Sequence, residues 1–127
     1  MTENELARIV YHKGMKLHKA LGPGLLEKVY EECLFKDLQK AGLSVVRQKS
    51  IPIKYNGDII DAAFRADLII NDKLLLELKS VSQLNDVHMA QTITYLKMTN
   101  LKLALLINFN VVLFKDGIRR VINSRTQ

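Results

Sequence analysis

Apolar residues in the first third of the chain recur at helical spacing, and this pattern predicts two helices. The first should span about residues 3–21, because Thr2 and Glu5 have the spacing of a capping box and a Gly-Pro-Gly sequence follows the last apolar repeat. The second should span about residues 25–41, where an apolar stripe is followed by Gly42, a residue type that commonly ends helices.

After Gly42 the apolar pattern changes to a period of two, which predicts β-strands. The dipeptide Asn56-Gly57 is typical of a tight hairpin turn between the first two of them. The predicted strands are Val45–Tyr55, Asp58–Asp61, Phe64–Ile70 and Leu74–Val81.

The last third of the chain predicts one more helix and a final set of strands. The helix should begin at Asn85 or Asp86 and end near Asn100. The strands are expected over Leu101–Ile107, Val111–Lys115 and Ile118–Ile122, with a hairpin turn at Asp116-Gly117 between the last two. Without an internal repeat or linker, residues 1–127 should form a single α/β domain with a mixed sheet.

Two opposite charges interrupt the strand that should be the most buried. Glu77 and Lys79 lie in the apolar run Leu74–Val81, and residues two apart on a strand point the same way, about 6 to 7 Å from each other. A buried charge costs several kcal/mol unless it is paired, bound to metal or used in chemistry. On a solvated edge strand the same pair would be an ordinary surface contact, and both interpretations stay open from this run alone.

Asp67 is a second charge within an apolar strand, and its relation to Glu77 depends on strand register. If Asn71-Asp72-Lys73 is a three-residue connection, residue 70 lies opposite 74 and Asp67 lies opposite Glu77. A two-residue turn would instead send the two carboxylates to opposite faces. We therefore predict the three-residue connection, or a bulge with the same effect.

The predicted second helix also carries a carboxylate in an unexpected place. On a helical wheel of about 100° per residue, Glu27 falls between Leu34 and Leu38, inside the apolar arc. It is a candidate member of the same acidic site. The alternative is a first-turn acid that the helix dipole favours.

The predicted third helix has a polar strip formed by His88, Gln91 and Tyr95. These three residues fall within about 60° of one another on the wheel, so they can address one site together. A solvated or half-buried helix face is the alternative interpretation.

Composition narrows the classes of protein. The net charge of +6 and pI near 9.5 favour polyanionic partners, with six basic residues and one acidic residue from Lys97 through Arg125. Solvated surface charge would give the same composition. The single Cys33 excludes an internal disulfide and a thiolate zinc site, and no signal peptide or membrane-spanning run is visible, so we expect a cytoplasmic protein.

Four motifs in order resemble one family. Gly24-Leu-Leu-Glu-Lys-Val-Tyr30 matches G-x-x-E-x-x-Y. Phe64-Arg-Ala-Asp67 and Glu77-Leu-Lys79 match the two parts of D…E-x-K, and Gln91-x-x-x-Tyr95-Leu96 matches Q-x-x-x-Y-L. The chain strongly resembles the GxxExxY proteins, which are placed in the PD-(D/E)XK nuclease superfamily. The resemblance runs from about His18 to Asn123.

The resemblance implies a fold and a chemistry. The fold would be an αβββαβ core with an extra N-terminal helix and a C-terminal hairpin. Positions matching Asp67 and Glu77 bind Mg²⁺ or Mn²⁺ in such enzymes, often with a helix glutamate, here Glu27, while the one matching Lys79 orients or activates the attacking water. Gln91 and Tyr95 would contact nucleic acid by analogy.

A nuclease is thus the leading hypothesis, and a nuclease-fold module that binds nucleic acid or a protein partner without cutting is the alternative. The sequence does not separate DNA from RNA, endonuclease from exonuclease, or monomer from homodimer. His12 and His18 are unassigned, with core or surface roles expected for both.

Overall fold

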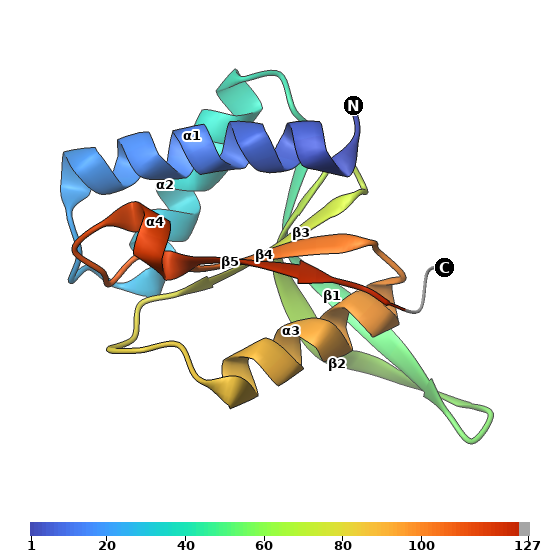
Figure 1. Ribbon diagram of the computed structural model, residues 1–127. Helices are drawn as coiled ribbons and strands as arrows, with labels where there is room; N and C mark the ends of the chain where they lie inside the picture. The colour runs from blue at the N-terminus through green and yellow to red at the C-terminus, as the bar shows by residue number, and fades with distance from the viewer. Residues whose placement is uncertain (125–127) are drawn as a thin grey trace.

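The computed structural model describes residues 1–124, which form a five-stranded mixed sheet with helices on both faces (Figure 1). The strand order is the order of the sequence, and only the β3–β4 pair is parallel. The helices are α1 (Glu3–Leu21), α2 (Glu27–Lys40), α3 (Asp86–Thr99) and the short α4 (Phe114–Gly117). The strands are β1 (Val45–Tyr55), β2 (Asp58–Ile70), β3 (Leu74–Lys79), β4 (Leu103–Asn108) and β5 (Ile118–Ile122). The predicted α/β class and nuclease-like element order are confirmed.

Local sequence signals account for the helix ends. The Thr2 side chain accepts a hydrogen bond from the Glu5 backbone N–H and the Glu5 carboxylate accepts one from the Thr2 N–H, which completes the predicted capping box. α1 ends at Gly22, whose φ of 73° is costly for residues with a Cβ. Asn85 caps α3 in the same reciprocal manner, with His88 as its partner.

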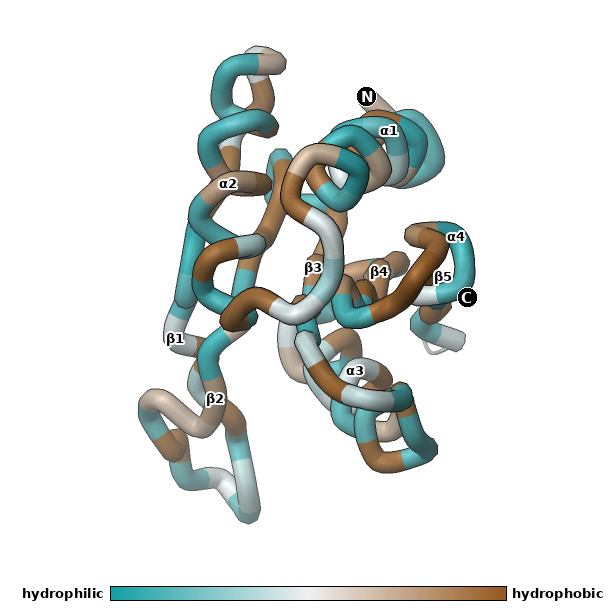
Figure 2. The backbone as a smooth tube through the Cα atoms, turned by 90° about the vertical axis from the view of Figure 1, so that its left-hand side faces the viewer, coloured by the Kyte–Doolittle hydropathy of each residue, from teal (hydrophilic) through white to brown (hydrophobic). Residues whose placement is uncertain are grey.

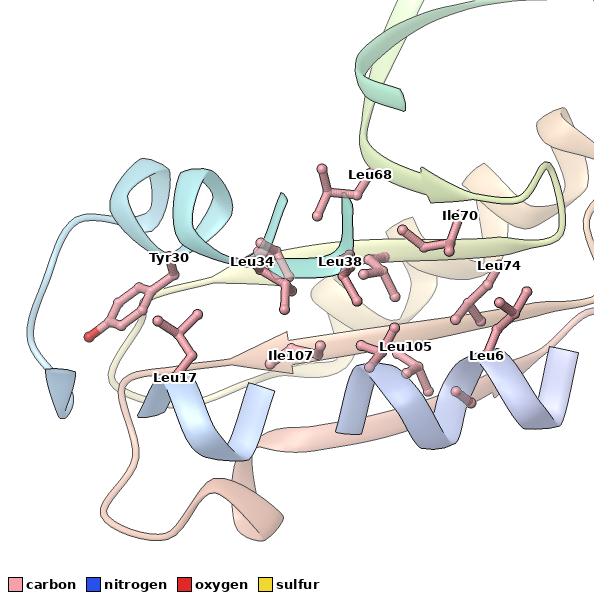
Figure 3. Packing of buried hydrophobic residues seen from close by; sticks show 14 of the residues in the cluster. Leu6, Leu17, Tyr30, Leu34, Leu38, Leu68, Ile70, Leu74, Leu105 and Ile107 are labelled. Atoms are coloured by element: carbon pink, nitrogen blue, oxygen red, sulfur yellow. The ribbon is translucent and has the colours of Figure 1, made fainter. Parts of the chain in front are cut away.

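The core has one apolar layer on each face of the sheet. α1 and α2 cover one face, where side chains from both helices meet alternate residues of β2, β3 and β4 (Figure 3). α3 covers the other face through Leu96, which packs with Leu75, Ala104 and Leu106. β3 and β4 are therefore buried on both sides, as their continuous apolar sequences predict.

The β2–β3 connection has the predicted register. Ile70 pairs with Leu74 and Leu68 with Leu76, so residues 71–73 form a three-residue connection. Asn71 and Asp72 adopt positive φ values of 51° and 55°, a conformation that Asn and Asp tolerate better than most residues. This register places Asp67 at the level of Glu77.

The division of the segment after the first hairpin turn into two strands was wrong. The segments expected as separate strands over 58–61 and 64–70 form one long strand, β2, in which Ala62 has a φ of 53°. The outer part of the β1–β2 hairpin projects beyond the body of the domain (Figure 2).

The strand predicted over Val111–Lys115, with its turn at Asp116-Gly117, was also wrong, because α4 lies there and β5 pairs directly with β4. Phe114 turns inward beneath α1, where a Cβ on Gly14 would lie 2.5 Å from its ring. Val112, which continues the apolar run, is 87% exposed. Packing of one aromatic side chain thus overrides the local strand pattern.

Within residues 1–124 no helix has the length and apolar character needed to cross a membrane. Arg125, part of the basic C-terminal segment, lies outside the described residues.

Candidate functional site

Asp67 and Glu77 lie where β2 and β3 separate. The ladder between the strands stops at the Leu68–Leu76 pair, and side chains then take the place of backbone partners. The Asp67 N–H donates to Glu77 Oε2 at 2.9 Å, and the Leu78 N–H donates to Asp67 Oδ2 at 2.8 Å. We call this crossed arrangement the carboxylate fork. It brings the two predicted acids together in a buried position, with exposures of 9% and 3%.

Burial of two neighbouring carboxylates disfavours their ionised forms. Burial and, second, the charge of Asp67 raise the pKa of Glu77 to about 8. Burial likewise raises the pKa of Asp67, although its hydrogen bond from the Leu78 N–H acts in the opposite direction. At neutral pH the fork therefore favours a bound proton or another cation.

Lys79 is the cationic side chain of β3, and its charge acts on both carboxylates of the fork. Its Nζ donates to Gln91 Oε1 on α3 at 3.3 Å, and the side chain is half-buried. Its charge partly offsets the effects that raise the pKa values of Asp67 and Glu77. Lys79 thus joins the fork to the polar strip of α3.

The α2 side of the site differs in part from the prediction. Glu27 is an exposed residue in the first turn of α2, and its pKa is raised by partial burial and then by Asp67, so it borders the fork instead of lying in the apolar arc. Glu31, one turn later, is the buried acid, at 6% exposure. Sequence reasoning missed Glu31, although its position four residues after Glu27 places both on one helix face.

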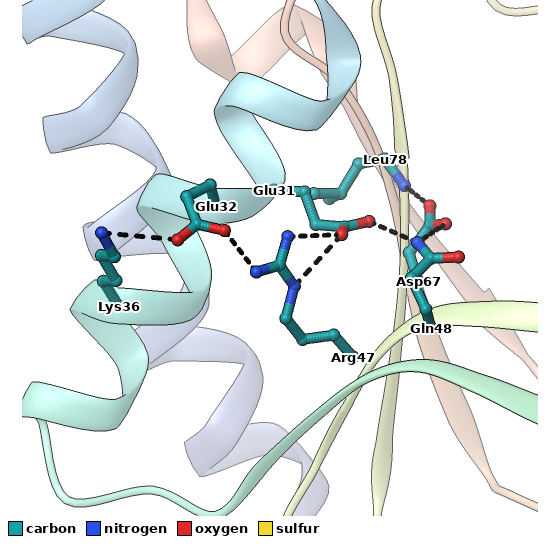
Figure 4. Close-up of polar contacts among 7 residues, drawn as sticks. All are labelled: Glu31, Glu32, Lys36, Arg47, Gln48, Asp67 and Leu78. Carbon is teal, nitrogen blue, oxygen red and sulfur yellow. Dashed lines mark hydrogen bonds and ion pairs between the residues drawn. The ribbon is translucent and has the colours of Figure 1, made fainter.

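A chain of polar contacts connects Glu31 to the fork (Figure 4). Gln48 Nε2 donates to Glu31 Oε1 at 2.7 Å and to Asp67 Oδ1 at 3.3 Å. Arg47 donates to Glu31 Oε2 at 3.0 Å and also pairs with Glu32. Gln48 has a φ of 48°, an uncommon conformation for a residue with a long side chain, and it lets consecutive residues of β1 both reach α2.

Two of the three residues of the polar strip on α3 lie at the site. Gln91 contacts Lys79, and Tyr95 stacks on Phe64 of β2 with ring centroids 3.9 Å apart. Burial and then the charges of Glu77 and Asp67 raise the pKa of Tyr95. His88 instead accepts the Asn85 N–H at Nδ1, so its ring caps α3.

The oxygen atoms of the fork are the type of ligand that a hard cation binds, but they do not form a complete set of metal ligands. Carboxylate oxygens of Asp67 and Glu77 are ligands that Mg²⁺ and Mn²⁺ prefer, and the raised pKa of Glu77 shows that positive charge is favoured there. Across residues 1–124 no group of three or more His, Cys, Asp or Glu side chains is already gathered around one point. Further ligands would come from backbone oxygen, from water, or from the neighbouring acids Glu27 and Glu31.

His18 is structural. Its Nε2 lies 2.7 Å from the Val111 carbonyl oxygen and its ring packs near Phe114, so it ties α1 to the loop before α4. The expectation for His18 was a core or surface role, and the buried ring has the core role.

A mixed sheet flanked by helices, with an acidic pair and a lysine on two central strands, defines a nuclease-like domain. A family model described as the PD-(D/E)XK nuclease superfamily matches residues 4–121, and the chain belongs to this superfamily. Its members are usually nucleases that act on nucleic acid and generally use divalent metals such as Mg²⁺. No curated protein and no solved structure matched the chain.

Proposed function

We propose that this chain is a divalent-metal-dependent nuclease of the GxxExxY group that hydrolyses phosphodiester bonds in DNA or RNA. The observation that carries the proposal is the carboxylate fork with Lys79 beside it, because this acidic pair and lysine occur in a domain of a nuclease superfamily. The single Cys33 supports a cytoplasmic location as part of the same proposal.

In this proposal Asp67 and Glu77 hold Mg²⁺ or Mn²⁺. When bound, such a cation neutralises phosphate charge and lowers the pKa of water. The Leu78 N–H and the Gln48 amide keep the Asp67 carboxylate oriented, while the Asp67 N–H does the same for Glu77. Glu27, at the border of the fork, would bind through water.

Lys79 would position the attacking water with its ammonium group, and Gln91 would hold Lys79 in place through their 3.3 Å contact. Tyr95, stacked on Phe64, gives the substrate a rigid aromatic edge near the carboxylates. His88 would act in substrate binding only through the face of its ring that does not cap α3.

One observation favours a second function, a module that binds nucleic acid without cutting it. Both fork carboxylates already accept backbone N–H groups, and no third acid within residues 1–124 completes a ready metal cluster. Such a module would bind nucleic acid with a strong salt dependence and no turnover.

Cleavage by the wild type and by Asp67→Asn distinguishes these functions. Labelled single- and double-stranded DNA and RNA are incubated with Mn²⁺, with Mg²⁺ or with EDTA, and the products are separated by size. We expect metal-dependent products from the wild type and at least about a 100-fold lower rate from Asp67→Asn, because the variant loses a charged ligand.

Lys79→Met is the matched variant, since it should abolish cleavage while leaving Mn²⁺ binding to the acids intact. Asp37→Asn, an acid of α2 that makes no contact with the fork, serves as the control and should cut like the wild type. Full activity in folded Asp67→Asn would reject the assignment, and the lack of any metal-dependent product from the wild type would favour the binding module.

A further inference from the structure

A groove runs along the seam between α1 and the edge strand β5, away from the carboxylate fork. Three adjoining hollows of about 210, 580 and 200 Å³ form it. Tyr11 lines the first and second hollows, while Asn4 and Arg120 line the second and third, so the three are continuous. Figure 1 shows α1 and β5 side by side, with α4 at the end of the seam where α1 finishes.

The groove is strongly basic. Its charged lining consists of five exposed cations and one acid: Arg8, Lys19, Lys102, Lys115, Arg120 and Glu3. The ion pairs formed within residues 1–124 all involve Glu31 or Glu32 of α2, so none of them neutralises a groove cation. Arg120 donates to the uncharged Asn4 side chain.

The charge distribution indicates an extended anion. Lys19 and Lys115 line one end of the groove, Arg8 and Arg120 its middle, and Lys102 the other end. From Asn4 to Lys19, α1 rises by about 22 Å, which corresponds to roughly six phosphates of each strand when measured along the axis of a duplex. A single small anion would use only part of this row.

The fork itself cannot supply affinity for a polyanion. Four acids, Glu27, Glu31, Asp67 and Glu77, lie in this region. Two cations accompany them: Arg47, which pairs with Glu31, and Lys79, which contacts Gln91. Phosphate groups approaching this acidic region are repelled until a cation is bound there, so favourable charge must come from another surface.

We propose that the groove between α1 and β5 binds the phosphate backbone of nucleic acid, as an accessory site outside the carboxylate fork. This inference rests on the proposed function, because it takes the polyanion in the groove to be the substrate of the nuclease. Binding in the groove raises the local concentration of nucleic acid at the domain and does not itself break a bond.

Fluorescence anisotropy with labelled 20-nucleotide DNA and RNA tests the proposal, with EDTA present so that cleavage is absent. Arg8→Ala/Arg120→Ala should bind about ten-fold or more weakly at low salt. Loss of two phosphate contacts should also reduce the slope of log K against log salt by about 1.4 for single strands and about 1.8 for duplexes. Arg8→Lys/Arg120→Lys should retain most of the affinity, because backbone phosphates are recognised mainly by charge.

The matched control is Lys40→Ala/Lys54→Ala, which removes the same charge from exposed positions outside the groove. It should change affinity less than three-fold. Lys19→Ala/Lys115→Ala is a second groove variant that should reproduce the loss if the arginine variant is unstable, and circular dichroism checks that each variant is folded.

The outcomes separate the groove from the proposed cleavage. Two results would overturn the groove proposal: an equal loss of affinity in the groove and control variants, or tighter binding of polyglutamate than of nucleic acid. A wild type that cuts while its groove variants bind normally also overturns the groove but leaves the nuclease proposal standing. Selective loss of binding in the groove variants supports the groove even if the wild type never cuts.

Discussion

Replacing Glu77 with glutamine should stabilise the domain, even though it removes a proposed metal ligand. The carbonyl oxygen of the introduced amide can still accept the Asp67 N–H, so the shape of the carboxylate fork is kept. The variant removes the ionisation of a side chain that is 3% exposed and lies beside a second carboxylate. Sites built for charge commonly sacrifice stability in this way.

The magnitude follows from linkage. The pKa of Glu77 rises from 4.5 to about 8, so the folded state holds a proton that the unfolded state releases between these pH values. The free energy of unfolding that protonated Glu77 contributes is therefore fully present below pH 4.5. It is lost as pH rises through about 8. At about 1.4 kcal/mol per pH unit the full loss is of the order of 2 to 5 kcal/mol, because Asp67 shares part of the effect.

Thermal unfolding in EDTA from pH 4.5 to pH 8.5 measures this effect. We expect Glu77→Gln and the wild type to melt within a few degrees of each other at pH 4.5. At pH 8.5 the variant should melt roughly 10 °C higher, given about 3 to 5 °C per kcal/mol for a domain of this size. Saturating Mn²⁺ should raise the wild-type melting temperature at pH 8 and narrow the difference.

Glu32→Gln is the control with the opposite sign. Its hydrogen bonds with Arg47 and Lys36 lower the pKa of Glu32, so its charge contributes stability above its ordinary pKa and loses it in acid. This variant should be no more stable than the wild type at pH 8. Two results would refute the argument that the ionised Glu77 carboxylate destabilises the fold. One is a difference in melting temperature between Glu77→Gln and the wild type that does not change with pH, and the other is a lower melting temperature of the variant at pH 8.5.

Two other predictions concern metal affinity and packing. Mn²⁺ affinity measured by calorimetry should rise up to about ten-fold per pH unit between pH 6 and pH 8 and then level off. The reason is that the ion competes with the proton on Glu77, whose pKa is about 8. An affinity that stays constant over this pH range would contradict the prediction. Gly14→Ala should lower the free energy of unfolding by about 1 to 3 kcal/mol, since the added Cβ would lie 2.5 Å from the Phe114 ring; a combined Gly14→Ala/Phe114→Leu variant in urea unfolding should recover part of the loss if the clash is the cause.

Much of the fold could be predicted because local signals and burial agree. The capping residues of α1, the stop at Gly22 and the double-sided apolar runs of β3 and β4 each favour the structure they adopt. The strand predicted at 111–115 failed because its apolar residues satisfy a strand pattern, whereas inward packing of Phe114 decides the conformation. A contact between residues 14 and 114 leaves no trace in the local pattern.

The two acids of the candidate site could be predicted from the sequence, but the residues that surround them could not. Asp67 and Glu77 were visible as charges in apolar strands, and the register that joins them followed from requiring both on one side of a three-residue connection. Neither Gln48 nor Glu31 interrupts an apolar strand, and the one sequence signal for Glu31 is its position four residues after Glu27 on the same helix face. Gln48 has a left-handed backbone, and its side-chain amide links Glu31 to Asp67.

The carboxylate fork also explains why the charges lie where the strands part. A side chain inside a continuous ladder has no backbone N–H to accept, since its neighbours are paired with the next strand. At the end of the β2–β3 ladder the N–H groups of Asp67 and Leu78 become available, and each is satisfied by a carboxylate of the site. The separation of the strands thus creates the donors that hold two buried acids together, and burial in turn makes a cation the favoured partner of those acids.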